Sequence, residues 1–254
     1  MNENQQQLLS LLCDVDAICR QFDIKYTLQG GTLLGAVREN GFISWDDDID
    51  LAMSRKNYER FKEIFPKQSR EYSLLEGYVG GALQIISKEN PYISADIFVY
   101  DYITENKFLQ KIRIYGLIIL QALLKTKETI KLTSIEEHSA LKYNIYRFVS
   151  FLGRPIPQKA KMLFYKWFSK NAFDGKKAYI HMSNDSARYL HRIIPAEYLD
   201  NLIEQPFEEH NFFIFKNYDA VLKISYGEDY MTPKEDLLTR RRHKRFRDNL
   251  SNRI

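Results

Sequence analysis

The stretch from Tyr26 to Ala52 constrains this chain more than any other part of its sequence. It reads YTLQGGTLLGAVRENGFISWDDDIDLA and contains a glycine pair, an arginine and four aspartates. Asp48 and Asp50 lie two apart in the segment 43–52, which we expect to be a strand, so both side chains point to one face. Two adjacent carboxylates repel each other unless a cation lies between them. Oxygen ligands favour Mg²⁺ or Mn²⁺, and Mg²⁺ is usually held by one or two carboxylates together with substrate phosphates. The stretch therefore predicts a metal site for a phosphate-bearing substrate.

A glycine pair lies upstream of that strand. Gly30 and Gly31 follow a short strand-like run, 26–28, and open a segment, 32–39, with good helical propensity. Strand, glycine turn and helix together allow backbone N–H groups at a helix N-terminus to bind an anion. Arg38, near the end of the helical segment, is suited to a bidentate contact with a phosphate.

An EF-hand calcium loop is the nearest alternative for the acidic run. Asp46, Asp48 and Asp50 would occupy its first three ligand positions, but the loop needs glycine at its sixth position and glutamate at its twelfth. This sequence has Leu51 and Asn57 there, which excludes the EF-hand. Taken alone, the acidic run could equally be a solvated turn instead of a metal site. The glycine pair alone could equally be an ordinary turn.

The segment GGTLLGAVRENGFISWDDDIDLAM resembles the signature of the LicD family of phosphocholine transferases, which is related to the fukutin group and belongs to the nucleotidyltransferase superfamily. The resemblance implies a glycine pair that opens a helix, a carboxylate-x-carboxylate strand and a third carboxylate on a later strand. The first two features correspond to Gly30, Gly31, Asp48 and Asp50. The later strand corresponds to DIFVYD, residues 96–101, where Val99 replaces the proline of the family pattern DIFPLD.

Asp96 is the better candidate for the third carboxylate. It lies inside the apolar segment ISADIFVY, whereas Asp101 fits an aspartate that caps a turn at a strand end. Asp96 would complete a metal site with Asp48 and Asp50, and would also be placed to accept the proton of an attacking hydroxyl. Lys88, in the preceding strand, is a candidate for contacting a phosphate, although most lysines at such positions are simply solvated.

The last third of the chain carries a second part of the resemblance. Residues 193–231 contain Pro, Phe-Glu, Asn-Tyr-Asp and Tyr-Gly-x-x-Tyr-Met in the order of the LicD pattern. On this resemblance, Tyr226, Gly227, Asp229 and Tyr230 are candidates for closing over the nucleotide. A Tyr-Gly turn that only ends a helix is the alternative.

A strongly basic run, 240–247, follows that segment. His243 within it is similar to a histidine that the family carries there, and it is a further candidate for binding substrate. Such a run is commonly a solvated tail. It is also suited to a phosphate-rich acceptor or an anionic membrane.

Length, charge and cysteine content restrict the class of protein. A chain of 254 residues can form one domain, or a catalytic domain with a helical addition. The net charge of +4 is too small to indicate a nucleic-acid partner. Cys13 and Cys19 are roughly 9 Å apart along a predicted helix, which excludes a disulfide between them. With a polar start and no signal peptide in view, we expect a cytoplasmic, reduced protein.

The remaining pattern predicts the order of the elements. A core-facing helix is expected over 8–22, and a second over 54–65, capped by Ser54 and ended by Pro66. Short apolar runs split by glycine and Asn-Pro predict three strands between residues 72 and 101.

The most apolar part of the chain is the segment 107–131. Its run from Tyr115 to Leu124 is shorter than the roughly 20 residues that a bilayer requires. A buried helix of an inserted subdomain is favoured. A basic-flanked helix that rests on an anionic membrane face, suited to a lipid-linked acceptor, is the alternative. The aromatic residues of 142–173 are expected mainly to pack in the interior.

These observations predict an α+β fold, with a nucleotidyltransferase-like mixed sheet flanked by helices and a mostly helical inserted region. The expected parts are a catalytic core over 1–105, a helical insertion over 106–190 that contacts acceptor or membrane, and a C-terminal part over 191–254 that completes the catalytic domain. The resemblance implies transfer of phosphocholine from CDP-choline to a sugar hydroxyl of a bacterial surface glycan, such as teichoic acid, lipopolysaccharide or capsule, and the predicted metal site implies dependence on Mg²⁺. The apolar segment 107–131 and the basic run 240–247 are the candidates for peripheral contact with the inner membrane face.

Three alternatives remain open for the function. The donor can be CDP-ribitol or CDP-glycerol, since no choline cage is evident in the sequence. The same carboxylates also suit nucleotide transfer from ATP or CTP. A non-catalytic membrane or glycan-binding protein is the alternative from another class.

Overall fold

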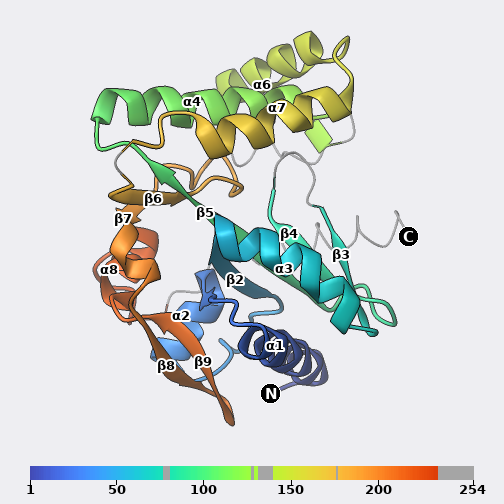
Figure 1. Cartoon of the computed structure of the whole chain (residues 1–254), viewed down its shortest axis with the longest axis vertical. Helices are drawn as coiled ribbons and strands as arrows, with labels where there is room; N and C mark the ends of the chain where they lie inside the picture. Colours follow the sequence, from blue (N-terminus) through green and yellow to red (C-terminus); the bar gives the residue numbers. More distant parts are fainter. Residues whose placement is uncertain (77–80, 127–128, 131–139, 176, 234–254) are drawn as a thin grey trace. The chain divides into compact units, whose positions relative to one another are not determined.

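The computed structural model describes residues 1–76, 81–126, 129–130, 140–175 and 177–233. These residues form two compact units: the first comprises 1–76, 83–100 and the described residues from Glu197 onward, and the second comprises the described residues within 77–82 and 101–196. The elements in chain order (Figure 1) are α1 (Glu3–Gln21), β1 (Thr27–Leu28), α2 (Gly30–Arg38), β2 (Ile49–Ser54), α3 (Arg55–Gln68), β3 (Tyr72–Leu75), β4 (Leu83–Ser87), β5 (Ser94–Ile103), α4 (Lys107–Leu124), α6 (Ala140–Gly153), α7 (Gln158–Asn171), β6 (Tyr179–Met182), β7 (Ile193–Pro195), the 3-10 helix η3 (Ala196–Leu199), β8 (Leu202–Phe207), β9 (His210–Phe215) and α8 (Tyr218–Tyr226).

A mixed sheet forms the centre of the first unit. Its strands follow the order β1-β2-β5-β4-β3, and β8 and β9 form a separate hairpin. β2 and β5 run parallel, while β1 with β2, β4 with β5, and β3 with β4 pair antiparallel. α3 packs against β2 and α2 lies beside β2. The predicted α+β class, with a mixed sheet flanked by helices, is confirmed.

Capping decides where the first helices begin. α1 begins at Glu3, five residues before the predicted start, because Asn2 and Gln5 form a capping box. α3 begins after Ser54, whose side chain accepts from the backbone N–H of Asn57, as predicted. The predicted end at Pro66 is wrong, since α3 continues to Gln68. A proline so near the C-terminus of a helix removes only one hydrogen bond, and Pro66 is exposed.

The two faces of the central strands differ in character. On β2, Ile49, Leu51 and Met53 are fully buried and alternate with the half-buried Asp50. On β5, Ala95, Ile97 and Val99 are buried and alternate with Asp96. Because strand residues alternate between faces, one face of these two strands is apolar core and the other presents the aspartates.

Helices α4, α6 and α7 dominate the second unit, and α4 packs against both of the others. Its core is a cluster of Leu117, Leu124, Tyr165 and Leu190. The favoured prediction of a buried helix within 107–131 holds for only one face of α4, which carries Leu117 and Leu124, since Tyr115 and Ile119 are exposed. Strands β6 and β7 pair with each other, so the unit is not purely helical. None of the described helices combines the length and apolar character needed to cross a bilayer.

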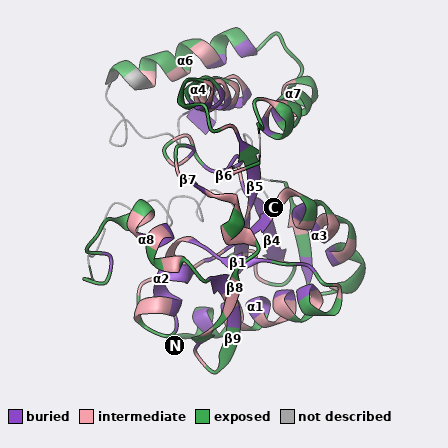
Figure 2. Ribbon diagram, turned by 60° about the vertical axis from the view of Figure 1, so that its left-hand side comes forward, coloured by how far each residue is buried: buried purple, intermediate pink, exposed green. Residues whose placement is uncertain are grey.

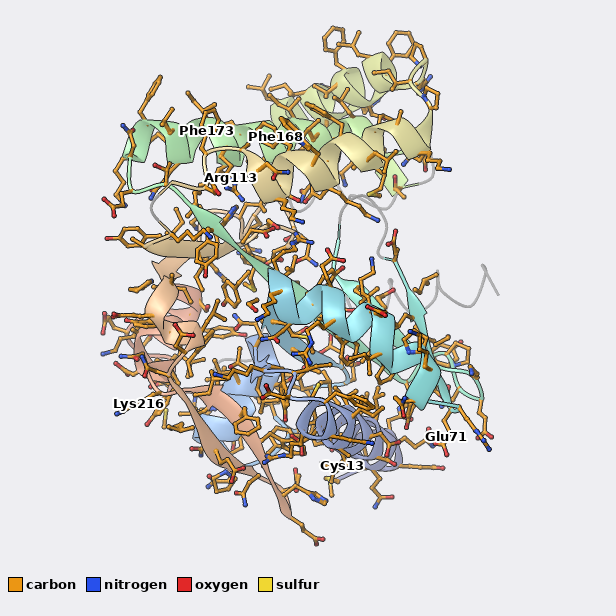
Figure 3. The ribbon with its side chains drawn as sticks, viewed as in Figure 1. Cys13, Glu71, Arg113, Phe168, Phe173 and Lys216 are labelled. Carbon is orange, nitrogen blue, oxygen red and sulfur yellow. The ribbon has the colours of Figure 1, made fainter. Side chains whose placement is uncertain are left out.

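A buried arginine holds two helices of the second unit together. Arg113, labelled in Figure 3, belongs to α4 and is completely buried. Its guanidinium donates to the carbonyls of Tyr102 and Ala172, both at 2.6 Å, and to the carbonyl of Ser169. Ser169 and Ala172 lie at the C-terminal end of α7, where a positive charge is favoured by the helix dipole. Arg113 therefore ties α4 to the end of α7.

His181 on β6 makes the stability of the protein depend on pH. The side chain is completely buried, and its Nδ1 lies 3.0 Å from the carbonyl oxygen of Leu190. Burial, reinforced by the positive charge of Arg113, lowers the pKa of His181 to about 4. The unfolded state therefore binds more protons than the folded state between that pKa and the ordinary pKa of about 6.5, so stability rises with pH across this window. We expect the free energy of unfolding in urea to fall by about 3 kcal/mol as the pH drops from 6.5 to 4.

The variant His181→Asn should lose that part of the pH dependence. His191→Asn, a change of an exposed histidine, should keep it. If the His181→Asn and wild-type proteins showed the same slope of stability against pH, the assignment to His181 would be wrong.

Candidate active site

Two aspartates lie side by side on the central strands of the first unit. Asp50 on β2 and Asp96 on β5 are direct partners in the parallel register. Neighbouring strands are about 4.8 Å apart, and both side chains are half-buried on the same face of the sheet. The structure thus brings together two of the three carboxylates that the sequence singles out.

Asp48 lies just outside the strand. The prediction of a strand from residue 43 is wrong, because β2 begins at Ile49 and residues 42–48 form a loop. The loop turns where the N–H of Asp46 donates to the carbonyl of Ile43 at 2.8 Å. The carbonyls of Ile43 and Asp46 both accept from Nε2 of the buried Gln5, at 3.2 Å each, and so pair with α1 instead of a neighbouring strand.

The glycine pair forms the first turn of α2, directly against the carboxylates. Gly30 has φ +57°, a conformation that only glycine adopts without strain, and an added Cβ would lie 2.0 Å from Oδ2 of Asp50. A Cβ on Gly31 would lie 2.5 Å from Oδ2 of Asp46. The glycines are therefore required because two carboxylates approach the backbone at the start of the helix.

Hydrogen bonds fix the backbone of Asp50 and the side chain of Asp96. The hydroxyl of Thr32 accepts from the N–H of Asp50 at 2.9 Å, and the carbonyl of Asp50 accepts from the N–H of Gln29 at 2.9 Å. Gln84 is the register partner of Asp96 on β4, and its Nε2 donates to Oδ1 of Asp96 at 2.9 Å. Gln84 therefore orients the carboxylate of Asp96.

Three residues of this site, Asp46, Gln84 and Thr32, are not predicted from the sequence. Asp46 stands in the acidic run but is adjacent to Gly31 only in the fold. Gln84 acquires its role from the register of β4 against β5, which no local pattern encodes. Thr32 is the one with a local signal, as a hydroxyl in the first turn of the predicted helix.

Arg38 and Lys88 are not brought to the carboxylates. Arg38 ends α2, about 12 Å along the axis from Gly30, and its guanidinium is engaged by the side chain of Glu39 at 2.8 Å and the carbonyl of Tyr230 at 3.3 Å. Lys88 follows the end of β4 and donates from Nζ to the carbonyl of Arg70 at 2.7 Å. The proposed phosphate contact of each residue stays a prediction that this arrangement does not favour.

The C-terminal tyrosines gather around the end of α8. Gly227, with φ +94°, ends the helix by donating to the carbonyl of Lys223 at 2.9 Å. Tyr230 is buried and donates to Asp219 at 2.9 Å, while Tyr226 is exposed. The structure therefore supports the alternative that this turn ends a helix, and closure over a nucleotide stays a prediction. His243 and the basic run 240–247 lie outside the described residues.

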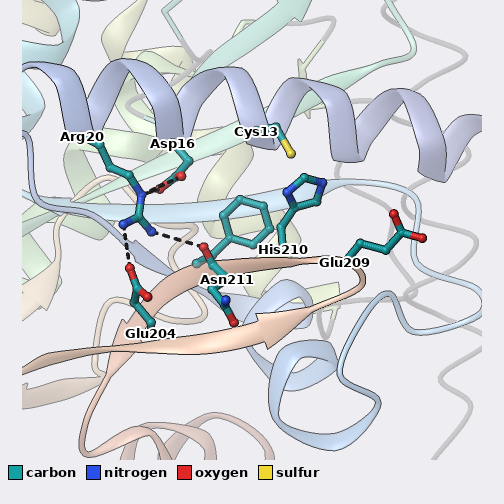
Figure 4. Close-up of a pocket in the computed structure, with 8 residues that line it drawn as sticks. Cys13, Asp16, Arg20, Glu204, Glu209, His210 and Asn211 are labelled. Atoms are coloured by element: carbon teal, nitrogen blue, oxygen red, sulfur yellow. Dashed lines mark hydrogen bonds and ion pairs between the residues drawn. The ribbon is translucent and has the colours of Figure 1, made fainter.

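A separate pocket of about 430 Å³ lies between α1 and the β8–β9 hairpin (Figure 4). Arg20 lines this pocket and forms salt bridges with Asp16 at 2.8 Å and with Glu204 at 2.6 Å. Burial raises the pKa of the Cys13 thiol there, and Asp16 and Asp14 raise it further, so the thiol is not an activated nucleophile. The carboxylates of this pocket would repel a diphosphate. None of the predicted site residues lines the pocket.

The two carboxylates offer oxygen ligands, which are the kind that a hard cation such as Mg²⁺ prefers. Within the part of the chain that the structure describes, no three His, Cys, Asp or Glu side chains gather closely enough to hold a metal by themselves. Mg²⁺ rarely needs such a cage, because one or two carboxylates commonly hold it with substrate phosphates and water. Asp50 and Asp96 supply two, and a metal role for Asp48, Asp50 and Asp96 stays a prediction.

A mixed sheet that places carboxylates on adjacent strands, beside a helix opened by glycine, defines a nucleotidyltransferase-like domain. Residues 23–116 match the family model described as LicD/FKTN/FKRP, nucleotidyltransferase domain. This match covers α2, β2 and β5, and with it Gly30, Asp48, Asp50 and Asp96. The LicD family that the sequence resemblance implies is thus supported by a family model over residues 23–116.

Similar proteins extend this finding along the chain. The lipopolysaccharide cholinephosphotransferase LicD of Haemophilus influenzae is 28% identical over 264 aligned positions, which cover 93% of this chain and 94% of that protein. An uncharacterized protein of Rickettsia typhi is 38% identical over 60 residues, 24% of this chain and 19% of its own length. One of Rickettsia prowazekii is 27% identical over 110 residues, 40% of this chain and 41% of its own length.

Proposed function

We propose that this protein transfers phosphocholine from CDP-choline to a sugar hydroxyl of a bacterial surface glycan. The observation that carries the proposal is the pair Asp50 and Asp96, set in register beside the glycine start of α2. The similarity to a lipopolysaccharide cholinephosphotransferase over nearly the whole of both chains supports phosphocholine as the group transferred and a glycan as the acceptor.

Different residues of the chain have different proposed roles in the reaction. Asp48, Asp50 and Asp96 would hold Mg²⁺, which when bound supplies charge neutralisation for the diphosphate and the departing CMP. The N-terminus of α2 presents backbone N–H groups of its first turn toward the same region, where an anion is favoured. Thr32 fixes the backbone of Asp50.

Asp96 is also the proposed general base. Gln84 donates to Oδ1 of Asp96, which orients the carboxylate to accept a proton. The carboxylate accepts the proton of the sugar hydroxyl as the hydroxyl oxygen forms its bond to the β-phosphorus of CDP-choline. The bond from that phosphorus to the oxygen bridging the two phosphates breaks, and CMP leaves.

The donor is tested by thermal stability with Mg²⁺ and, in turn, CDP-choline, CDP-ribitol, CDP-glycerol, ATP and CTP. A nucleotide at 100 times its dissociation constant adds about 2.7 kcal/mol of stability. We expect a Mg²⁺-dependent shift with CDP-choline and release of CMP when acceptor glycan is added. A shift confined to ATP or CTP, with release of pyrophosphate, would instead identify a nucleotidyl transfer, and a shift confined to CDP-ribitol or CDP-glycerol would identify another donor of the same class.

A further inference from the structure

Helix α6 of the second unit exposes an apolar stripe. Leu141, Ile145, Phe148 and Leu152 follow one another at intervals of four, three and four residues, which places them on one face of the helix. Their side chains are from 52% to 71% exposed. Figure 2 shows most of α6 as exposed. A helix that belongs wholly to the interior would bury such a stripe.

The other two helices repeat the pattern. On α7, Phe164 and Trp167 are stacked, with ring centroids 5.7 Å apart, and both are more than half exposed. On α4, a stripe with the same spacing is exposed and consists of Phe108, Ile112, Tyr115 and Ile119. The prediction that the aromatic residues of 142–173 mainly pack in the interior is wrong for Phe148, Phe151, Phe164 and Trp167. Exposed apolar surface on this scale marks a contact site.

The charge of these helices has one sign. α4, α6 and α7 contain no Asp or Glu, and their Lys and Arg residues are Lys107, Lys111, Arg113, Lys142, Arg147, Lys159, Lys161, Lys166 and Lys170. The whole chain, by contrast, has nearly balanced charge, with 37 basic and 33 acidic residues. On α7, Lys159, Lys166 and Lys170 are exposed around the stacked aromatic pair.

The junction of α6 and α7 is anchored to the end of α4. Ser150 donates to the carbonyl of Lys125 at 2.7 Å, and Nζ of Lys161 donates to the carbonyls of Leu123 and Gly153 at 2.9 and 3.0 Å. A Cβ on Gly153 would lie 2.6 Å from the carbonyl oxygen of Leu123, so the close approach depends on glycine. These contacts therefore hold the ends of α6 and α7 in place against α4.

We infer that α6 and α7 form a docking surface for a bilayer that contains anionic phospholipid. The aromatic and aliphatic side chains would enter the boundary between head groups and acyl chains, and the lysines would contact lipid phosphates. These helices contain no Asp or Glu that the negative charge of the lipid would repel. A second copy of the chain is a poorer occupant, because it would bring two faces of the same positive charge together. The inference stands independently of the transfer reaction.

Sedimentation of the full chain with vesicles tests this inference. We expect binding to phosphatidylcholine vesicles that contain phosphatidylglycerol, and much weaker binding to phosphatidylcholine alone. Each of two double variants, Phe148→Ser with Leu152→Ser and Lys166→Glu with Lys170→Glu, should weaken the partition by about tenfold or more. Two matched controls replace exposed residues of the first unit and should bind as the wild type: Leu75→Ser with Tyr92→Ser, and Lys56→Glu with Lys216→Glu.

Tryptophan fluorescence gives a second reading of the same event. The chain has only Trp45 and Trp167, and insertion of Trp167 should shift emission to the blue on addition of anionic vesicles, an effect that Trp167→Phe removes. Vesicle binding that both double variants leave intact would assign the contact to another surface. Absence of vesicle binding would overturn the inference, and a wild-type dimer that the Phe148→Ser, Leu152→Ser variant converts to a monomer would then identify the face as an interface between copies.

Discussion

Replacement of Asp50 by asparagine is expected to abolish turnover while the protein stays folded. Asparagine keeps the size of the side chain, and the hydrogen bonds of residue 50 to Thr32 and Gln29 use backbone atoms that the change leaves in place. The change also removes one of two adjacent like charges, so we expect the free energy of unfolding to move by no more than about 1 kcal/mol. The loss of a negative charge from the proposed metal site should reduce CMP release by about a thousandfold or more.

Asp47→Asn is the matched control for this experiment. Asp47 belongs to the same acidic run and is half-buried like Asp50, but it is not one of the proposed metal ligands. CMP release should stay within a few-fold of the wild type in Asp47→Asn. The nucleotide-dependent thermal shift with Mg²⁺ should be lost in Asp50→Asn and kept in the control. Substantial activity in both Asp50→Asn and Asp48→Asn would refute the assignment of this site.

The sequence predicts the elements that carry a strong local pattern. Ser54 before an apolar periodicity predicts α3, and the short apolar runs between 72 and 101 predict β3, β4 and β5. The Asp48-x-Asp50 spacing and the glycine pair predict the candidate site, and the structure places Asp50 beside Gly30. These are all properties of short, continuous segments of the chain.

Features that depend on pairing between distant segments are not visible in the sequence. Nothing near Gln84 indicates that it will face Asp96, because the register of β4 against β5 sets that contact. Arg38 looks suited to a phosphate, yet the fold brings the carbonyl of the distant Tyr230 to its guanidinium. The aromatic residues of α6 and α7 have the spacing of core residues, yet Phe148, Phe164 and Trp167 are exposed in the fold.

Gly30→Ala is expected to damage both stability and activity. The backbone of Gly30 is in the left-handed region at φ +57°, where a side chain costs about 1–2 kcal/mol. The new methyl group would also lie 2.0 Å from Oδ2 of Asp50, so either the carboxylate or the first turn of α2 must move. We expect a loss of about 2–4 kcal/mol in the free energy of unfolding. Displacement of Asp50 by about 1 Å should lower the rate of CMP release by about a hundredfold.

Gly175→Ala separates the two effects, because it imposes a similar strain on the second unit. Gly175 has φ +60°, and an added Cβ would lie 2.7 Å from the Cα of Thr104. Both variants should therefore lose stability in urea unfolding, but at a temperature where each remains folded only Gly30→Ala should lose activity. Wild-type turnover by folded Gly30→Ala would mean that the contact of Gly30 with Asp50 serves folding alone. Equal loss of turnover in both variants would mean that activity follows overall stability and not the position of the carboxylate.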